Sequence, residues 1–122
     1  MSNRPGRLAG VEVLPRYRFE LLVQEALDDL PDELLPVLDN VVVQIQDRHP
    51  DEPDLLGLYE GTPHTERWGD ELPDVVSIYR LPLCESCADL DELADEVYVT
   101  VIHEIAHAAG IDDERLHDLG WA

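Results

Sequence analysis

The residues best suited to chemistry lie near the C-terminal end, in the stretch H-E-I-A-H-A-A-G-I-D-D that begins at His103. His103 and His107 are four residues apart, so on a helix they share one face and can bind a single metal ion. Glu104 lies between them, beside that ion without binding it, where it can act as a general base. The spacing predicts a hydrolytic zinc site with two histidine ligands and a catalytic glutamate.

A catalytic zinc ion takes three protein ligands and keeps a fourth position for water, so the histidines need a further partner. Gly110 can end the helix in the left-handed conformation and turn the chain back toward the metal. Asp113 is then the preferred third ligand, because a carboxylate binds zinc well and lowers the net charge of the site. A cap of the final helix is the competing interpretation of this aspartate. The alternative ligands are Asp112, Glu114 and His117.

The two histidines require a long helix, which we expect from about Leu90 to Ala109. Asp89 can cap its start, with Glu92 three residues later as the partner of a capping box. On a helical wheel the histidines lie nearly opposite an apolar ridge that should face the core. That ridge consists of Leu90, Ala94, Val97, Val101, Ile105 and Ala108.

The preceding sequence predicts an amphipathic helix and a small sheet. Apolar residues at helical spacing indicate a helix over residues 16–30, followed by a short helical turn over 32–38 that Pro36 interrupts. Alternating patterns predict strands over residues 41–46, 55–59 and 74–81. Pro73 and Pro82 bracket the last of these strands, which favours a sheet edge where a peptide substrate could pair. A short helix over residues 113–119 completes the expected α+β domain.

Composition limits the class of protein. A chain of 122 residues with 44% apolar residues forms one small domain. Its net charge of −20 excludes nucleic acid as an expected partner and favours cations, including basic peptides. No segment is apolar enough to span a membrane, and residues 1–10 lack the apolar core of a secretory signal. We therefore expect a cytoplasmic protein with a flexible arm over residues 1–15 and a single domain over residues 16–122.

A few further residues are secondary candidates. His117 and Tyr79 are possible auxiliary groups, as an alternate ligand or as donors to a developing oxyanion. Cys84 and Cys87 form a C-x-x-C pair in the expected loop before the long helix. A structural zinc site needs four ligands and no second such pair exists, so an ordinary pair of loop cysteines is favoured over a redox centre. A metal site shared between subunits stays open, as does the oligomeric state.

The segment from Glu92 to Trp121 resembles the small bacterial zincin-like metallopeptidases, or minimal zincins, whose pattern is H-E-x-x-H-x-x-G-x-x-D. Leu56–Gly61 and Ile78–Leu83 also look like segments of that family, so the resemblance covers most of residues 17–121. It implies an α+β fold in which a small mixed or antiparallel sheet packs against the active-site helix and the N-terminal helix. It also implies His103, His107 and Asp113 as Zn²⁺ ligands with Glu104 as the base.

The motif and the family resemblance are compatible with two functions. The first is a zinc-dependent metallopeptidase that cleaves peptide bonds with a water activated by Glu104. The second is a zinc-binding interaction module of the same fold with little or no proteolytic activity. The only methionine is Met1, so no methionine turn can lie beneath the metal as in the larger zincins. That departure and the small size of the chain favour the second function.

Overall fold

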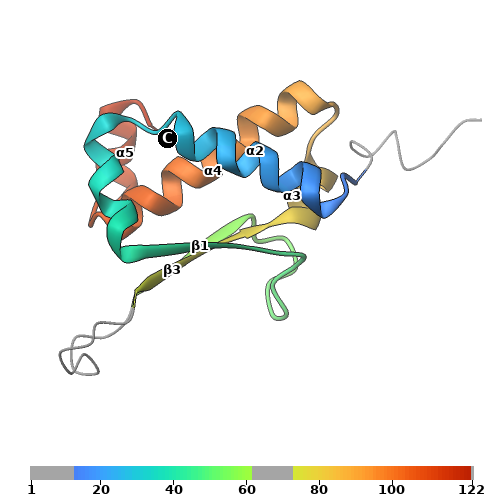
Figure 1. The fold of residues 1–122 in the computed structure, drawn as a ribbon, viewed down its shortest axis with the longest axis horizontal. Helices are drawn as coiled ribbons and strands as arrows, with labels where there is room; N and C mark the ends of the chain where they lie inside the picture. The colour runs from blue at the N-terminus through green and yellow to red at the C-terminus, as the bar shows by residue number, and fades with distance from the viewer. Residues whose placement is uncertain (1–12, 62–72, 122) are drawn as a thin grey trace, which may run out of the picture.

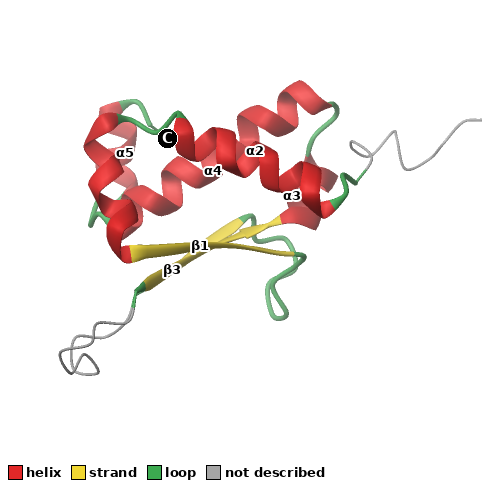
Figure 2. Ribbon diagram, in the orientation of Figure 1, coloured by secondary structure: helices red, strands yellow, loops and turns green. Residues whose placement is uncertain are grey.

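The computed structural model of this chain describes residues 13–61 and 73–121. Over these residues the fold has two layers, with helices packed on one face of a three-stranded sheet (Figures 1 and 2). The expected α+β class and the mixed sheet are therefore confirmed. Most of the expected N-terminal arm over residues 1–15 lies outside the described residues. No described helix is long and apolar enough to cross a membrane.

The sheet consists of β1 (Val41–Gln46), β2 (Gly57–Glu60) and β3 (Asp74–Tyr79), in the order β1-β3-β2. β3 pairs with β1 in parallel and with β2 in antiparallel orientation. The prediction that this third strand lies at an edge, open to a peptide, is therefore wrong. The two prolines that suggested an edge lie outside β3, at positions 73 and 82, so they remove no hydrogen-bond donor from its ladders.

The two faces of the sheet have different roles. Val43 pairs with Val76, and Ile45 with Ile78, on the face that packs against the helices. On the opposite face the amide of Gln44 donates to the Ser77 hydroxyl at 2.9 Å. This period-two alternation matches the one expected for β1 from the sequence. The helix-facing side of β3 thus packs against the long helix that carries the two histidines of the motif.

Two helical segments precede the sheet. α2 (Arg16–Asp28) begins after Pro15 and buries Phe19, Val23 and Ala26 against α4 (Leu90–Ala108), as its amphipathic pattern predicted. The next segment, η1 (Asp32–Asn40), is a 3-10 helix that contains Pro36. A proline at this position removes one backbone donor and opposes regular α-helical bonding, which explains the tighter helix.

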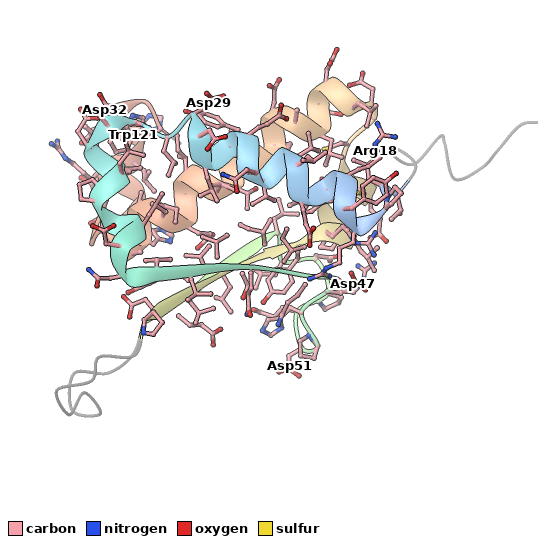
Figure 3. The ribbon with its side chains drawn as sticks, viewed as in Figure 1. Arg18, Asp29, Asp32, Asp47, Asp51 and Trp121 are labelled. Carbon is pink, nitrogen blue, oxygen red and sulfur yellow. The ribbon has the colours of Figure 1, made fainter. Side chains whose placement is uncertain are left out.

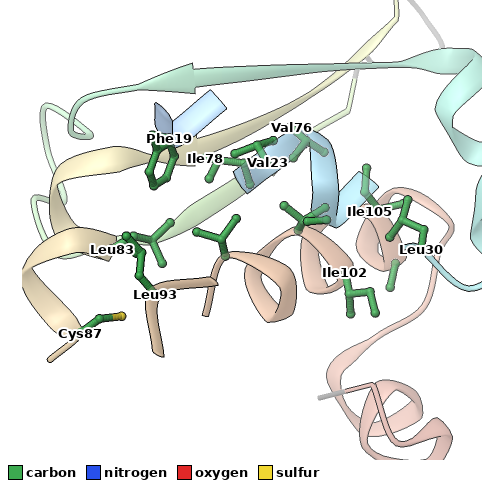
Figure 4. Close-up of a cluster of buried hydrophobic side chains, with 14 of the residues drawn as sticks. Phe19, Val23, Leu30, Val76, Ile78, Leu83, Cys87, Leu93, Ile102 and Ile105 are labelled. Carbon is green, nitrogen blue, oxygen red and sulfur yellow. The ribbon is translucent and has the colours of Figure 1, made fainter. Parts of the chain in front are cut away.

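A short helix, α3 (Arg80–Ser86), follows β3 where the sequence predicted the end of a strand and then a loop. Pro82 is tolerated there because it lies in the first turn, whose N–H groups have no helical acceptor. Leu83 and Cys84 are buried, and Cys87, just past the helix, is buried as well. Figure 4 shows Leu83 and Cys87 close to Leu93 within the cluster of buried side chains. Both cysteines are free thiols, and burial raises the pKa of Cys87, which disfavours the reactive thiolate.

The long helix α4 (Leu90–Ala108) begins as expected from its capping residues. The Asp89 carboxylate accepts from the backbone N–H of Glu92 at 2.8 Å, and the Glu92 carboxylate accepts from the N–H of Ala88. The ridge predicted for its buried face is only partly correct, because Leu90 and Ala94 are exposed. The first turn of α4 packs through Leu93 instead, which shifts the buried stripe by one position. The fully or largely buried side chains are Leu93, Val97, Thr100, Val101, Ile102, Glu104, Ile105 and Ala106.

The acidic residues lie mainly at the surface. Figure 3 shows the labelled side chains Asp29, Asp32, Asp47 and Asp51 at the periphery of the two layers, and all four residues are exposed. Arg80 donates to the Asp47 carboxylate at 3.0 Å, which ties the start of α3 to the end of β1. A surface of this kind keeps the protein soluble and attracts cations over a distance set by the salt concentration.

Candidate metal centre

The two histidines of the motif lie on one face of α4, near its C-terminal end. Their ring centroids are 4.4 Å apart, and the ring planes meet at 72°. The side chains are about one third exposed, at 32% for His103 and 30% for His107. The negative end of the helix dipole lies here and favours a bound cation. The helix therefore presents two imidazoles to solvent rather than burying them in the core.

The turn after α4 brings the chain back over this face. Gly110 has φ of +84°, the left-handed conformation that glycine adopts without strain. Its N–H donates to the His107 carbonyl at 2.9 Å, and the N–H of Ile111 donates to the Ala106 carbonyl at 2.9 Å. These two bonds form a Schellman motif, in which the residue after the glycine contacts the core. The predicted reversal at Gly110 is confirmed, and it delivers the start of α5 (Asp113–Leu119) to the histidines.

The two aspartates at this junction have different tasks. Asp112 caps α5, because its carboxylate accepts from the N–H of Arg115 at 2.9 Å. Asp113, the first residue of α5, points its carboxylate at both imidazoles instead. Its Oδ1 lies 2.8 Å from Nε2 of His107 and 3.2 Å from Nε2 of His103. The residue that caps the helix is therefore Asp112, which leaves Asp113 available as a ligand.

These three groups fit a zinc ion. Two imidazole nitrogens and a carboxylate are a usual ligand set for catalytic zinc, and tetrahedral ligands at ~2.0–2.1 Å lie about 3.3 Å from one another. The separations of 2.8 and 3.2 Å between the Asp113 oxygen and the two nitrogens are close to that value. The Asp113 side chain is 77% exposed, so the fourth side of such a site faces solvent. The arrangement matches a centre that keeps one position for water.

The other possible third ligands do not join this cluster. Glu114 and His117 are exposed, and neither side chain makes a hydrogen bond or ion pair with a residue in the described ranges. The proximity of the histidines lowers the pKa of Asp113, first through the hydrogen bond from His107 and then through the charge of both rings. A carboxylate that stays ionised is the form that binds a metal.

Glu104 is the buried member of the site, with 9% of its surface exposed. Its Oε1 lies 3.5 Å from Nδ1 of His107, on the opposite side of that ring from Asp113. Candidate ligand atoms of His103, Glu104 and His107 lie within 4.8 Å of one another. Asp113 and Glu104 thus lie at different nitrogens of the His107 ring, Nε2 and Nδ1.

Burial raises the pKa of Glu104 above its ordinary value of 4.5, although the two neighbouring histidines oppose the shift. The cause is visible in the packing of β2 against α4. A Cβ added at Gly57 would lie 2.8 Å from Cγ2 of Thr100 and 3.0 Å from Cγ of Glu104, so only glycine lets the strand approach this closely. Gly57 is thus a site residue that the sequence reasoning missed. A glycine within a predicted strand is the available signal, because it often marks a close backbone approach.

Tyr79 lies on the face of the sheet opposite the helices, by its alternation with Ile78. Its ring is buried and packs edge-on against His49 at a centroid distance of 5.7 Å. Burial raises the pKa of the Tyr79 hydroxyl. The structure therefore does not bring Tyr79 together with the histidines, and it leaves His117 at the exposed surface of α5.

In the metal-free protein, Glu104→Gln should be more stable than the unmutated chain at neutral pH. Because the pKa of Glu104 is raised on folding, the folded state binds the proton more tightly than the unfolded state does. The stability from this group is complete below pH 4.5 and is lost as the pH rises through the folded-state pKa. Glutamine does not ionise, so its advantage should vanish in acid. Urea unfolding with a chelator present gives the free energy of unfolding of both proteins, at neutral pH and at about pH 4.

Asp95→Asn is the matched control for this comparison. With a net charge of −20, removal of any carboxylate relieves some repulsion. Asp95 is exposed on α4, so its replacement reports that general effect alone. Equal stabilisation by the two variants at neutral pH would show that the burial of Glu104 has no special cost.

The fold and the site together define a class: a helix that carries H-E-x-x-H, packed on a small mixed sheet, with a carboxylate returned by the following turn. The chain belongs to the zincin-like metallopeptidase family, whose sequence profile matches residues 38–121. This range contains the sheet, α3, α4 and α5 but not α2. The family resemblance seen in the sequence is confirmed. A search of curated proteins finds no match.

Proposed function

We propose that this protein is a zinc-dependent peptidase in which His103, His107 and Asp113 hold the metal and Glu104 is the general base. The observation that carries the proposal is the convergence of one Asp113 oxygen on both Nε2 atoms, with the Glu104 carboxylate beside the same pair. When bound, zinc lowers the pKa of water in its open position and polarises a substrate carbonyl.

Glu104 then supplies the proton transfers. Its carboxylate accepts a proton from the attacking water and passes it to the amine that leaves when the peptide bond breaks. A pKa raised by burial suits this task, because it makes the carboxylate a stronger proton acceptor than an ordinary glutamate. Its contact with Nδ1 of His107 is long, at 3.5 Å, so this contact holds the carboxylate only weakly.

The substrate in this proposal is a peptide or an unfolded protein segment, with basic sequences preferred. The support is the net charge of −20, which raises the local concentration of cationic peptides. β2 is the edge strand nearest α4, so we assign main-chain pairing to β2 instead of β3.

Removal of the metal tests the proposal. Cleavage of a mixed peptide set by the zinc-loaded protein should disappear with a chelator and return after one equivalent of zinc is added. Mass spectrometry of the products measures cleavage at each step. Cleavage that persists at full rate in the chelator would contradict a zinc mechanism.

The second candidate function is a zinc-bearing binding module without useful turnover. The exposure of Asp113 favours it, because efficient hydrolysis benefits from a site that excludes water. A fully zinc-loaded protein that cleaves none of the peptides yet binds a partner equally well with Glu104 or glutamine would support this second function.

A further inference from the structure

A groove of about 380 Å³ begins at the candidate metal centre and runs along α4. One wall is the segment Asp54–Gly57, just before and at the start of β2. The other wall is a single face of α4, formed by residues at helical spacing. These residues are Glu96, Val99, Thr100, His103 and Glu104. Because the general base and a proposed ligand form one end, a side chain in this groove belongs to a residue beside the reacting bond.

The lining of the groove is partly apolar and partly acidic. Val99 lies on α4 between Glu96 and His103 and is 39% exposed, and Leu55 and Leu56 add apolar side chains from the other wall. Glu96 is the lining residue of α4 farthest along the helix from His103, Asp54 is a second carboxylate, and none of the described residues that line the groove is an arginine. Along α4 the groove therefore offers an apolar surface followed by negative charge.

Among the described residues, Glu96 has no hydrogen-bond or ion-pair partner that would stabilise the fold. Its side chain makes no hydrogen bond or ion pair with any residue within 13–61 or 73–121. Asp54 lies near Arg48, but the Arg48 guanidinium already donates to the Glu85 carboxylate at 2.6 Å and to the Pro53 carbonyl at 3.0 Å. The carboxylate of Glu96 is thus the main group available to a cation in the groove, with Asp54 as a weaker second.

The length of the groove matches a long side chain. Glu96 precedes His103 by seven residues, which is about 10 Å along a helix. An extended lysine or arginine side chain reaches about 6–7 Å from its Cα, and its charged head needs about 3 Å more to meet a carboxylate. Such side chains lay their stems on apolar surface and keep their heads in polar surroundings. Shorter polar side chains would end beside Val99, short of Glu96.

We propose that this groove is a specificity pocket for a lysine or arginine next to the cleaved bond, with its stem against Val99 and Leu55 and its head at Glu96. Asp54 adds to the attraction. The inference rests on the proposed peptidase function and narrows it, from a general preference for basic peptides to one defined basic position. Glu96 is then a residue that determines specificity and takes no part in the proton chemistry.

The test uses otherwise identical short peptides that carry lysine, arginine, norleucine or glutamate at one central position. Cleavage is measured with the zinc-loaded protein, and binding with its zinc-loaded Glu104→Gln variant by fluorescence anisotropy. In both assays lysine and arginine should be favoured over norleucine by about 10-fold, as expected for a charge pair at a partly exposed site. Glu96→Gln should reduce that ratio about 5-fold, and the Glu96→Gln/Asp54→Asn pair should bring it close to one.

Asp95→Asn is the matched control, since it removes the same charge from the neighbouring residue, which does not line the groove. It should keep the ratio. If Asp95→Asn and Glu96→Gln lower the preference for lysine and arginine over norleucine equally, the overall negative charge explains that preference and the pocket is overturned. Equal cleavage of the four peptides would also overturn the pocket, while the proposed peptidase function would stand. Preferential binding that depends on Glu96, without any cleavage, would support the pocket and contradict only the peptidase function.

Discussion

Glu104→Gln should lower kcat/KM for peptide cleavage by about 10²–10⁴, the range for loss of a general acid–base group. Glutamine keeps the size of the side chain beneath β2 but cannot accept the proton of the attacking water. Zinc binding should persist, because Asp113 and not Glu104 is the acidic group on the Nε2 side of His107. Single-turnover cleavage assays on protein of known zinc content measure the effect.

Glu114→Gln is the matched control for this experiment. Glu114 is exposed on α5, and its side chain makes no hydrogen bond or ion pair with the histidines among the described residues. The control should cleave at the unmutated rate. A Glu104→Gln variant that retains full zinc and more than about a tenth of the activity would remove Glu104 from the mechanism.

Alanine at His103, His107 or Asp113 should weaken zinc binding by more than about 100-fold, beyond what the loss of an outer hydrogen-bond partner costs. Each change removes one of three ligands, and the two that remain cannot complete a tetrahedral site with a single water. Competition with a chromophoric chelator gives the affinity, and circular dichroism shows whether the helices are kept.

His117→Ala and Glu114→Gln are the controls for the ligand series, since these residues were two of the three alternatives to Asp113, and the third, Asp112, caps α5. Both should bind zinc as the unmutated protein does, because both side chains are exposed and neither forms a hydrogen bond or ion pair with the cluster among the described residues. If Asp113→Ala keeps its zinc while His117→Ala loses it, the third ligand has been misassigned and α5 must rearrange when the metal binds.

Local sequence rules were sufficient for the helix that carries the motif and for its ends. The spacing of His103 and His107, the Asp89 cap and the left-handed Gly110 each depend on residues within one or two turns. The approach of Asp113 follows from the same turn. The sequence did not decide whether Asp112 or Asp113 caps the last helix, because either aspartate can do so. The hydrogen bond from Arg115 to Asp112 shows which of the two does so.

Features that depend on distant packing were predicted less well. The central place of β3 is set by its pairing with both other strands, and prolines just outside a strand do not reveal it. α3 lacks a side-chain cap and is stabilised by the burial of Leu83 and Cys84 in the core, so its local sequence did not predict a helix. Gly57 acquires its importance only where β2 meets α4. The groove that ends at Glu96 is formed by the same contact.

Elemental analysis is the most direct test of the zinc centre that underlies the proposed function. The protein would be purified without added metal, offered zinc in slight excess and dialysed, with His103→Ala handled in parallel. The site built from His103, His107 and Asp113 predicts close to one zinc per unmutated chain and a nearly metal-free variant. An unmutated protein that emerges without stoichiometric zinc, or a variant that retains it, would contradict this assignment.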